Sequence, residues 1–117
     1  MIFIVEEKDL KIARGYSVLY FYAPWLSCHR EMLGYMKVAE ENHPDVKFYG
    51  IDVDIFKSLI DRFEIFTLLC PSLPAVVITR EKSRIARHLI GAKWVAMIDA
   101  KLTKRINGTA NKEVDDV

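Results

Sequence analysis

The chain has 117 residues, of which 51% are hydrophobic and 28% are charged. This length and composition predict one globular domain with a single core, and they exclude a disordered segment or a fibre. Seventeen basic side chains nearly balance sixteen acidic ones, so the net charge of +1 gives no general field that attracts nucleic acid or anionic lipid. No stretch approaches the roughly 18 apolar residues that span a bilayer, so we expect no membrane contact.

The start of the chain and its cysteine content bear on location. The first residues contain a short apolar run followed by charges, with neither a preceding basic region nor a small-residue cleavage site. The two cysteines, Cys28 and Cys70, are too few for a disulfide framework. Both features favour a reducing cytoplasm.

The first part of the chain alternates strand and helix patterns. Residues 2–5 are rich in β-branched and aromatic side chains and predict a strand, and residues 6–15 predict a short helix that Gly15 ends. Residues 17–22 are apolar on both faces, which is typical of a strand covered on both sides of a sheet. We therefore expect this strand to be central.

Residues 27–42 have the spacing of an amphipathic helix. Ser27 can cap its first turn, and the turn-forming residues 42–45 end it. The apolar residues that recur at helical spacing are Met32, Tyr35, Met36 and Ala39. We expect these four side chains to pack in the core.

Another strand and helix follow. Residues 46–51 predict a strand, and Asp52 or Asp54 can cap the helix after it. The apolar side of that helix carries Ile55, Leu59, Ile60, Phe63 and Phe66, and it can extend to Leu69. Pro71 prevents further helix, and residues 75–79 predict the next strand.

The last part of the chain predicts a hairpin and a helix. Residues 84–91 predict a strand that ends at Gly91, and residues 93–106 predict an amphipathic helix with basic residues in its last turn. Residues 1–106 would form the domain, and residues 107–117 a polar C-terminal tail. The element order is therefore β-α-β-α-β-α-β-β-α. This order predicts an α/β fold with a mixed central sheet of about five strands and helices on both faces.

The pattern resembles the thioredoxin family over residues 2–104. The stretches that carry the resemblance are "VLYFYAPW" (18–25), "HPDVKFYGIDVD" (43–54), "RFEI" (62–65), "SLPAVVI" (72–78) and "IGA" (90–92). The first is the central strand with its Ala-x-Trp ending, and "SLPAVVI" is the strand entered through a proline. The resemblance implies the thioredoxin fold with a cis-proline at Pro74.

The family's redox activity rests on a Cys-x-x-Cys motif directly after the tryptophan. One thiol attacks a disulfide, and the second resolves the mixed disulfide. The matching residues here are Leu26, Ser27, Cys28 and His29, so neither cysteine position holds a cysteine. The family's buried carboxylate falls on Tyr20. The resemblance therefore implies a degenerate active site and a protein that is not a dithiol oxidoreductase.

Cys28 allows two interpretations. In the first helical turn, beside His29, its thiolate is favoured, so Cys28 would act as a single nucleophile that Cys70 or glutathione resolves. The helical phase that Cys28 shares with Met32 instead favours a buried, inert side chain. A Cys28–Cys70 disulfide would close a loop of about 42 residues and stabilise the fold by about 4 kcal/mol if the Cα separation allows it.

One surface of the family does not depend on thiols. In relatives, an extended polypeptide pairs with backbone groups at the cis-proline, in the manner of strand addition. The residues that would form this surface here are Trp25, Leu26, Ser72, Leu73, Pro74 and Gly91. The resemblance therefore implies binding of a protein or an extended peptide.

Other chemistry is not indicated. His29, His43 and His88 show no metal-ligand spacing with each other or with the cysteines, so we expect no metal site. No glycine-rich phosphate loop occurs, and we expect no cofactor. The basic residues in 82–88 and 101–105 are typical of solvated faces rather than of a nucleic-acid site. The sequence leaves the oligomeric state open.

Overall fold

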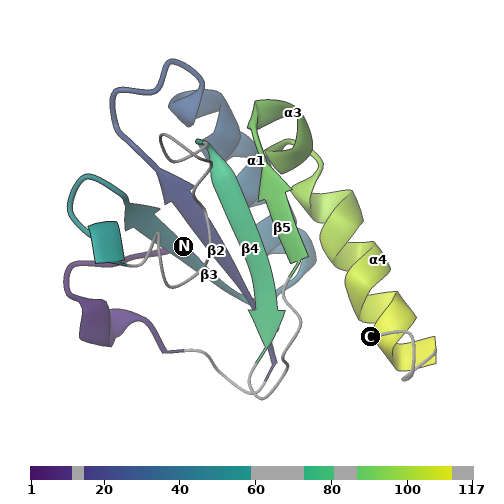
Figure 1. The fold of residues 1–117 in the computed structure, drawn as a ribbon. Coiled ribbons are helices and arrows are strands. Elements are labelled where there is room, and N and C mark those ends of the chain that lie inside the picture. Colours follow the sequence, from purple (N-terminus) through teal and green to yellow (C-terminus); the bar gives the residue numbers. More distant parts are fainter. Residues whose placement is uncertain (12–14, 59–72, 81–86, 112–117) are drawn as a thin grey trace.

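The computed structural model describes residues 1–11, 15–58, 73–80 and 87–111 (Figure 1). Its strands are β1 (Ile2–Phe3), β2 (Tyr16–Tyr22), β3 (Lys47–Asp52), β4 (Ala75–Arg80) and β5 (Arg87–Ile90). Its helices are the 3-10 helix η1 (Glu7–Asp9) and the α-helices α1 (His29–Asn42), α3 (Ala92–Val95) and α4 (Ile98–Asn111). All the predicted strands are present, although β1 has only two residues.

The strands form one mixed sheet in the order β1-β3-β2-β4-β5. β3 runs parallel to β1 and β2, with Tyr20 opposite Gly50, whereas β4 runs antiparallel to β2 and β5, with Phe21 opposite Ala75. These directions bring the ends of β2, β3 and β5 and the start of β4 together (Figure 1). We call this end of the sheet, where the connecting loops lie, the loop edge. The fold is thus the α/β class with the mixed sheet that the sequence predicts.

β2 is the central strand, and its alternate residues contribute to two cores. Val18 and Tyr20 lie in the core on the face that α1 and α4 cover, which we call the helix-side core. Leu19 and Phe21 lie in the second core, on the opposite face. All four are fully buried. Since burial of each large apolar side chain is worth about 1.5–3 kcal/mol, this two-sided burial explains why the strand is apolar on both faces.

Helix α1 begins at His29 rather than at the predicted Ser27. The His29 amide donates to the Leu26 carbonyl at 3.1 Å, and the Leu26 amide donates to the Ala23 carbonyl at 3.0 Å, so two successive turns precede the helix. Cys28 takes the N-cap position, and its side chain makes no capping hydrogen bond. The prediction of Ser27 as the cap is wrong because these backbone turns delay the start of the helix.

The core face of α1 is narrower than predicted. Met32, Met36 and Ala39 are buried, but Tyr35 is 38% exposed, and its hydroxyl donates to the Glu31 carboxylate at 3.3 Å. Neighbouring helix positions differ by about 100° around the axis, so Tyr35 lies on the flank of the face that Met36 occupies.

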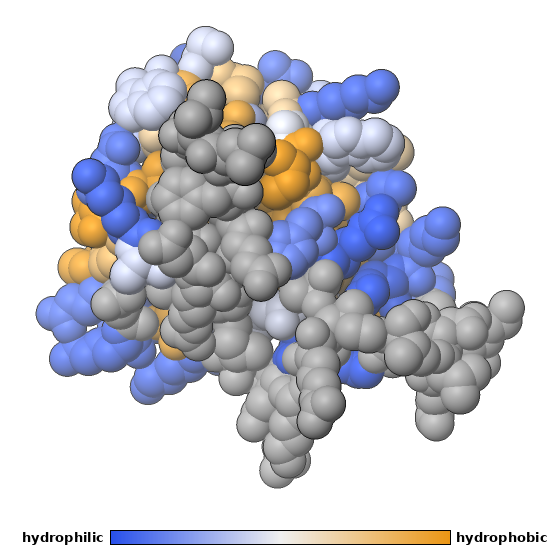
Figure 2. All heavy atoms as spheres, viewed as in Figure 1, coloured by the Kyte–Doolittle hydropathy of each residue, from blue (hydrophilic) through white to orange (hydrophobic). Residues whose placement is uncertain are grey.

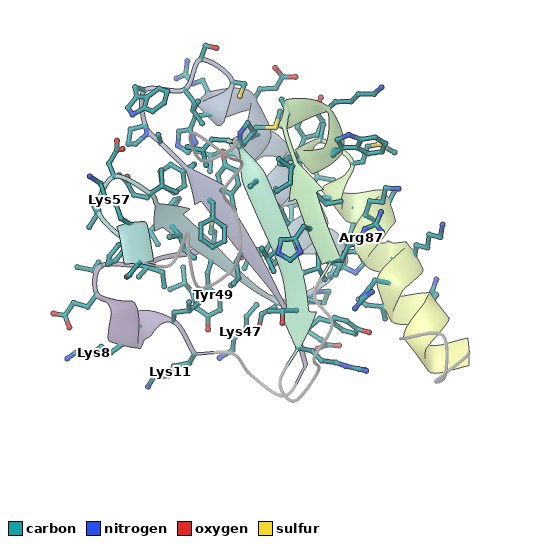
Figure 3. The ribbon with its side chains drawn as sticks, in the orientation of Figure 1. Lys8, Lys11, Lys47, Tyr49, Lys57 and Arg87 are labelled. Carbon is teal, nitrogen blue, oxygen red and sulfur yellow. The ribbon has the colours of Figure 1, made fainter. Side chains whose placement is uncertain are left out.

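In the described part of the predicted N-terminal helix, residues 6–11 contain only the short helix η1, and residues 12–14 lie outside the described residues. The Asp9 carboxylate accepts hydrogen bonds from the amides of Val5 and Glu6 at 3.2 and 2.9 Å. These bonds satisfy backbone amides at the start of η1, as in a capping box. Beyond η1, the Lys11 carbonyl accepts a hydrogen bond from the hydroxyl of Tyr49 at 2.8 Å, which fastens this segment to β3 (Figure 3).

The predicted C-terminal helix is divided in two. The Met97 amide donates to the Trp94 carbonyl at 3.0 Å, a tight turn that separates α3 from α4. Helix α4 then continues to Asn111, past residue 106 where the sequence predicts the helix to end. Within the described parts of the chain, no helix is long and apolar enough to cross a membrane.

The helix predicted after β3 is described only at its start. Residues 57 and 58 are helical, and the positions predicted for its apolar side from Leu59 onward lie outside the described residues. Ile55 was predicted on that apolar side but is 67% exposed, whereas Phe56 is buried. The Phe56 amide donates to the Asp52 carbonyl at 2.9 Å, and this turn directs Phe56 rather than Ile55 into the second core.

Candidate functional site

The loop edge gathers the residues of the predicted binding surface. The members that the structure describes are Trp25, Leu26, Leu73, Pro74 and Gly91. They follow β2, precede β4 and follow β5, and these three strands are neighbours in the sheet. Ser72 lies outside the described residues. Figure 2 shows hydrophobic residues, in orange, exposed near the upper end of β5, and hydrophilic residues, in blue, along α4.

Trp25 presents its ring to solvent at this edge. It is 69% exposed, and its Nε1–H donates to the Asp54 carboxylate at 2.9 Å. The Asp54 amide in turn donates to the Asp52 carboxylate at 2.9 Å, in the turn that follows β3. An exposed indole that is already held in place offers apolar area to a partner at a reduced cost in side-chain entropy. The sequence indicates Asp54 only as a helix cap, and this contact was not predicted.

The segment before β4 is joined to the end of β5. The Leu73–Pro74 peptide bond is cis. The Pro74 carbonyl accepts a hydrogen bond from the Gly91 amide at 2.8 Å, and Gly91 has a φ of +92°, a conformation that favours glycine. Leu73 is half-buried against the second core, and no residue in the described parts of the chain pairs with its backbone N–H or C=O. In strand addition, such backbone groups pair with the added chain.

The two residues that the sequence resemblance matches to the family's cysteines are packed side chains. Leu26 is half-buried against the second core. His29, the first residue of α1, is also half-buried. Since disulfide exchange requires sulfur, neither side chain can take part in it.

His29 forms a ring stack with two tyrosines of β2. Its Nδ1 and the Tyr20 hydroxyl share a hydrogen bond of 2.9 Å. Its ring stacks on Tyr22 with centroids 4.4 Å apart and planes at 14°, and the Tyr20 and Tyr22 rings stack with centroids 5.3 Å apart. Phe3 of β1 places its ring edge against Tyr22, with centroids 6.1 Å apart. Tyr20 and His29 are the residues that the sequence resemblance matches to the family's buried carboxylate and second cysteine, and in the structure they are bonded to each other.

The hydrogen bond satisfies a phenol that lies in the helix-side core. Tyr20 is fully buried, and a buried hydroxyl without a partner costs about 1–3 kcal/mol. Burial, followed by the nearby Cys28 and Tyr22 side chains, raises the pKa of Tyr20 well above its ordinary value, so the phenol keeps its proton. Burial lowers the pKa of His29, and the Asp52 carboxylate partly opposes this change. A neutral imidazole is therefore favoured, with Nδ1 placed to accept from Tyr20.

The lowered pKa of His29 predicts a pH-dependent stability. As the pH falls below about 6.5, the unfolded chain binds a proton at this histidine before the folded chain does, so the free energy of unfolding decreases. The contribution is complete above about pH 6.5 and is lost as the pH falls through the folded-state pKa. Urea unfolding of the wild type and of His29→Gln across this range isolates the effect from His43 and His88. Identical pH profiles for the two proteins would contradict the assignment.

Cys28 is a free thiol at the N-cap of α1. It is half-buried and packs against the helix-side core. Its place therefore has features of both interpretations, because it contacts the core and also lies beside the free amides of the helix start. Cys70 lies outside the described residues, and because Cys28 is free, the Cys28–Cys70 disulfide is not formed in this structure.

The remaining polar clusters do not belong to this edge. Within residues 1–11, 15–58, 73–80 and 87–111, no three His, Cys, Asp or Glu side chains are grouped to hold a metal ion. His43, at the C-cap of α1, places Nε2 3.0 Å from the Asp99 carboxylate and 3.1 Å from the Thr103 hydroxyl. This network joins α1 to α4 at the end of α1 that lies away from the loop edge.

Several solved thioredoxin structures share this fold. The thioredoxin of Trypanosoma brucei brucei matches with a TM-score of 0.74 and 21% identity, over 91% of this chain and 90% of its own. Thioredoxin O2 of Arabidopsis thaliana, in the oxidized state, matches with a TM-score of 0.73 and 17% identity, over 88% and 91% of the two chains. The germline-specific thioredoxin Deadhead of Drosophila melanogaster is 27% identical, with a TM-score of 0.62 over 80% of each chain. No protein-family model and no curated protein matches the sequence.

Proposed function

The chain has a thioredoxin-like fold, and we propose that it binds an extended peptide at the loop edge and does not catalyse dithiol exchange. We call the site the Trp25–Gly91 surface, and its members are Trp25, Leu26, Ser72, Leu73, Pro74 and Gly91. The observation that carries the proposal is the exposed Trp25 ring, held by Asp54, at the same edge as a Leu73 backbone that is unpaired among the described residues.

Two kinds of contact would bind such a peptide. Its backbone would pair with the N–H and C=O of Leu73, as in strand addition, and each hydrogen bond contributes about 0.5–1.5 kcal/mol. A peptide side chain would cover the Trp25 ring, and truncation of a tryptophan at the centre of an interface costs about 2 kcal/mol or more. The β2–β4 pairing ends with Phe21 opposite Ala75, so Leu73 precedes this pair by two residues on one strand and Trp25 follows it by four on the other.

The loss of dithiol chemistry follows from the residues at the two thiol positions. Exchange needs one thiolate that attacks the substrate disulfide and a second thiol that attacks the mixed disulfide. Leu26 is packed against the second core, and His29 is engaged with Tyr20 and Tyr22. Leu26 and His29 therefore pack within the domain, and neither side chain contains a sulfur atom.

A second candidate function is that of a monothiol oxidoreductase, which the position of Cys28 at the start of α1 favours. In this reaction, the Cys28 thiolate attacks a substrate disulfide and releases one substrate thiolate. Cys70 or glutathione then attacks the Cys28 sulfur, releases the second substrate thiolate and leaves Cys28 in a disulfide with the attacking thiol. Both candidates keep the cytoplasmic location that the sequence predicts.

Reduction of insulin disulfides by glutathione separates the two functions. Peptide binding alone predicts no acceleration by the wild-type protein. Acceleration that disappears in Cys28→Ser would instead establish the monothiol reaction. Acceleration that survives in Cys28→Ser would contradict a role for Cys28 as the nucleophile.

Selection from a phage-displayed library of random peptides tests the binding function. We expect enriched peptides that bind the wild type, and an affinity about 30-fold lower for Trp25→Ala. Val38 is 54% exposed on α1 and serves as the matched control, because Val38→Ala removes a similarly accessible apolar side chain outside the surface. Failure to enrich any peptide, or enriched peptides that bind Trp25→Ala as tightly as the wild type, would overturn the proposal.

A further inference from the structure

A second exposed indole lies next to the Trp25–Gly91 surface. Trp94 of α3 is 45% exposed, and its amide donates to the Gly91 carbonyl at 3.1 Å. Gly91 is thus the N-cap of α3, and its own amide donates a hydrogen bond to the Pro74 carbonyl. Met97, in the turn between α3 and α4, is 41% exposed. Accessible apolar side chains thus continue from the surface onto α3.

Two ammonium groups flank the Trp94 ring. The Nζ atoms of Lys93 and Lys101 lie 5.7 and 5.5 Å from its centroid, within the range of a cation–π contact. Asp99 is the one acidic residue in the sequence of α3 and α4. Its carboxylate interacts with Asn42 and His43 at the end of α1. The positive charge at Trp94 is therefore not balanced by a carboxylate of these two helices.

The charge at the other indole has the opposite sign. The charged group that contacts the Trp25 ring is the Asp54 carboxylate, and Asp52 lies in the same turn. The two accessible indoles therefore differ in their charged neighbours: Trp25 has a carboxylate beside it, and Trp94, three residues after Gly91, has two ammonium groups beside it.

We propose that Trp94, Lys93 and Lys101 bind acidic side chains at one end of the peptide that occupies the Trp25–Gly91 surface. This inference rests on the proposed function and adds the chemistry of the partner, which is an extended segment with carboxylates clustered at one end. The carboxylates pair with the two ammonium groups, and their aliphatic stems cover the open part of the indole. In the reverse direction the acidic end would meet Asp54, so the charges also select the direction in which the peptide lies.

Three synthetic peptides with the same core of alternating valine and threonine test this inference. The first has glutamates before the core and serines after it, the second has the reverse order, and the third has serines on both sides. Binding is followed by indole emission in two proteins with one tryptophan each, Trp25→Phe and Trp94→Phe. The emission of Trp25→Phe reports on Trp94, and the emission of Trp94→Phe reports on Trp25.

We expect one of the two glutamate peptides to bind about tenfold more tightly than the other two peptides. Lys93→Gln and Lys101→Gln should each remove about two- to fivefold of this preference, and added salt should weaken it. Lys47→Gln is the matched control, because Lys47 is the first residue of β3 and lies at the end of the sheet opposite the loop edge (Figure 3). We expect no change in this variant.

The two emission signals separate failure of this inference from failure of the proposed function. If Trp25 responds to the serine peptide and glutamates add no affinity, the acidic preference is wrong and the binding function stands. If Trp94 responds to the glutamate peptides while Trp25 responds to none, acidic segments bind α3 and the proposed function is wrong. Silence of both indoles overturns both. Phosphatidylserine vesicles that bind in place of the peptides, with the same dependence on the two lysines, would assign these side chains to a membrane and overturn the inference.

Discussion

Replacement of Tyr20 by alanine is expected to lower the free energy of unfolding by about 3–5 kcal/mol. Tyr20 is fully buried on the central strand, and the substitution removes its ring from the helix-side core and from the stack with Tyr22 and His29. Since single domains are stable by about 5–15 kcal/mol, this variant is expected to be at the limit of folding. Urea unfolding followed by circular dichroism measures the loss.

Tyr20→Phe isolates the hydroxyl group. It keeps the ring but removes the hydrogen bond to His29 Nδ1, so we expect a loss of about 1 kcal/mol. Tyr35→Phe is the control, because the Tyr35 hydroxyl also donates to a side chain but lies on the exposed flank of α1, where a change of less than about 0.5 kcal/mol is expected. Equal losses in the two phenylalanine variants would show that the buried bond has no special weight.

The combined substitution Leu26→Cys and His29→Cys, made in a Cys28→Ser background, is expected to create dithiol activity. The hydrogen bond of 3.1 Å from the His29 amide to the Leu26 carbonyl closes a turn. In such a turn the two Cα atoms lie within about 7 Å of each other, which is close to the range that a disulfide bridges. The new dithiol would reduce a substrate disulfide and become oxidised to this bridge. We expect insulin reduction by dithiothreitol to accelerate at least about tenfold over the parent protein.

The single variant Leu26→Cys in the same background is the control for this gain. It supplies an attacking thiol but no second thiol to resolve the mixed disulfide, so sustained turnover should be much slower. His29→Cys also removes the hydrogen-bond partner of the Tyr20 hydroxyl. Thermal unfolding of the single and the double variant shows how much of any difference in activity between them comes from a difference in stability. A double variant that forms the bridge but does not reduce insulin would show that the loop edge does not admit a protein disulfide.

The fold was predictable from the sequence because its strands differ strongly in pattern from its helices. Residues 17–22 and 75–79 are almost continuously apolar, and both lie in central strands buried on the two faces of the sheet. The prediction was wrong where local hydrogen bonds decide the outcome. The turns after Ala23 delay α1, and the Met97 turn divides the last helix.

The candidate site was predictable only in part. The positions of Trp25, Pro74 and Gly91 follow from the ends of the strands, so the resemblance could assign them to one edge. The hydrogen bond between Tyr20 and His29 depends on where α1 starts and on which side chain then faces the strand. Nothing in the spacing of these two residues indicates a contact. Trp94 was also missed, since an amphipathic pattern over residues 93–106 does not show that the helix breaks after Val95.

Both tryptophans of this chain are accessible to water in the folded protein, at 69% and 45% exposure. An indole in water already emits close to the red limit of its spectrum. Denaturation should therefore give only a small shift of the emission maximum toward the red, whereas a ligand that covers either ring should move it toward the blue. In this protein the wavelength of the intrinsic fluorescence thus reports occupancy of the indoles more strongly than unfolding.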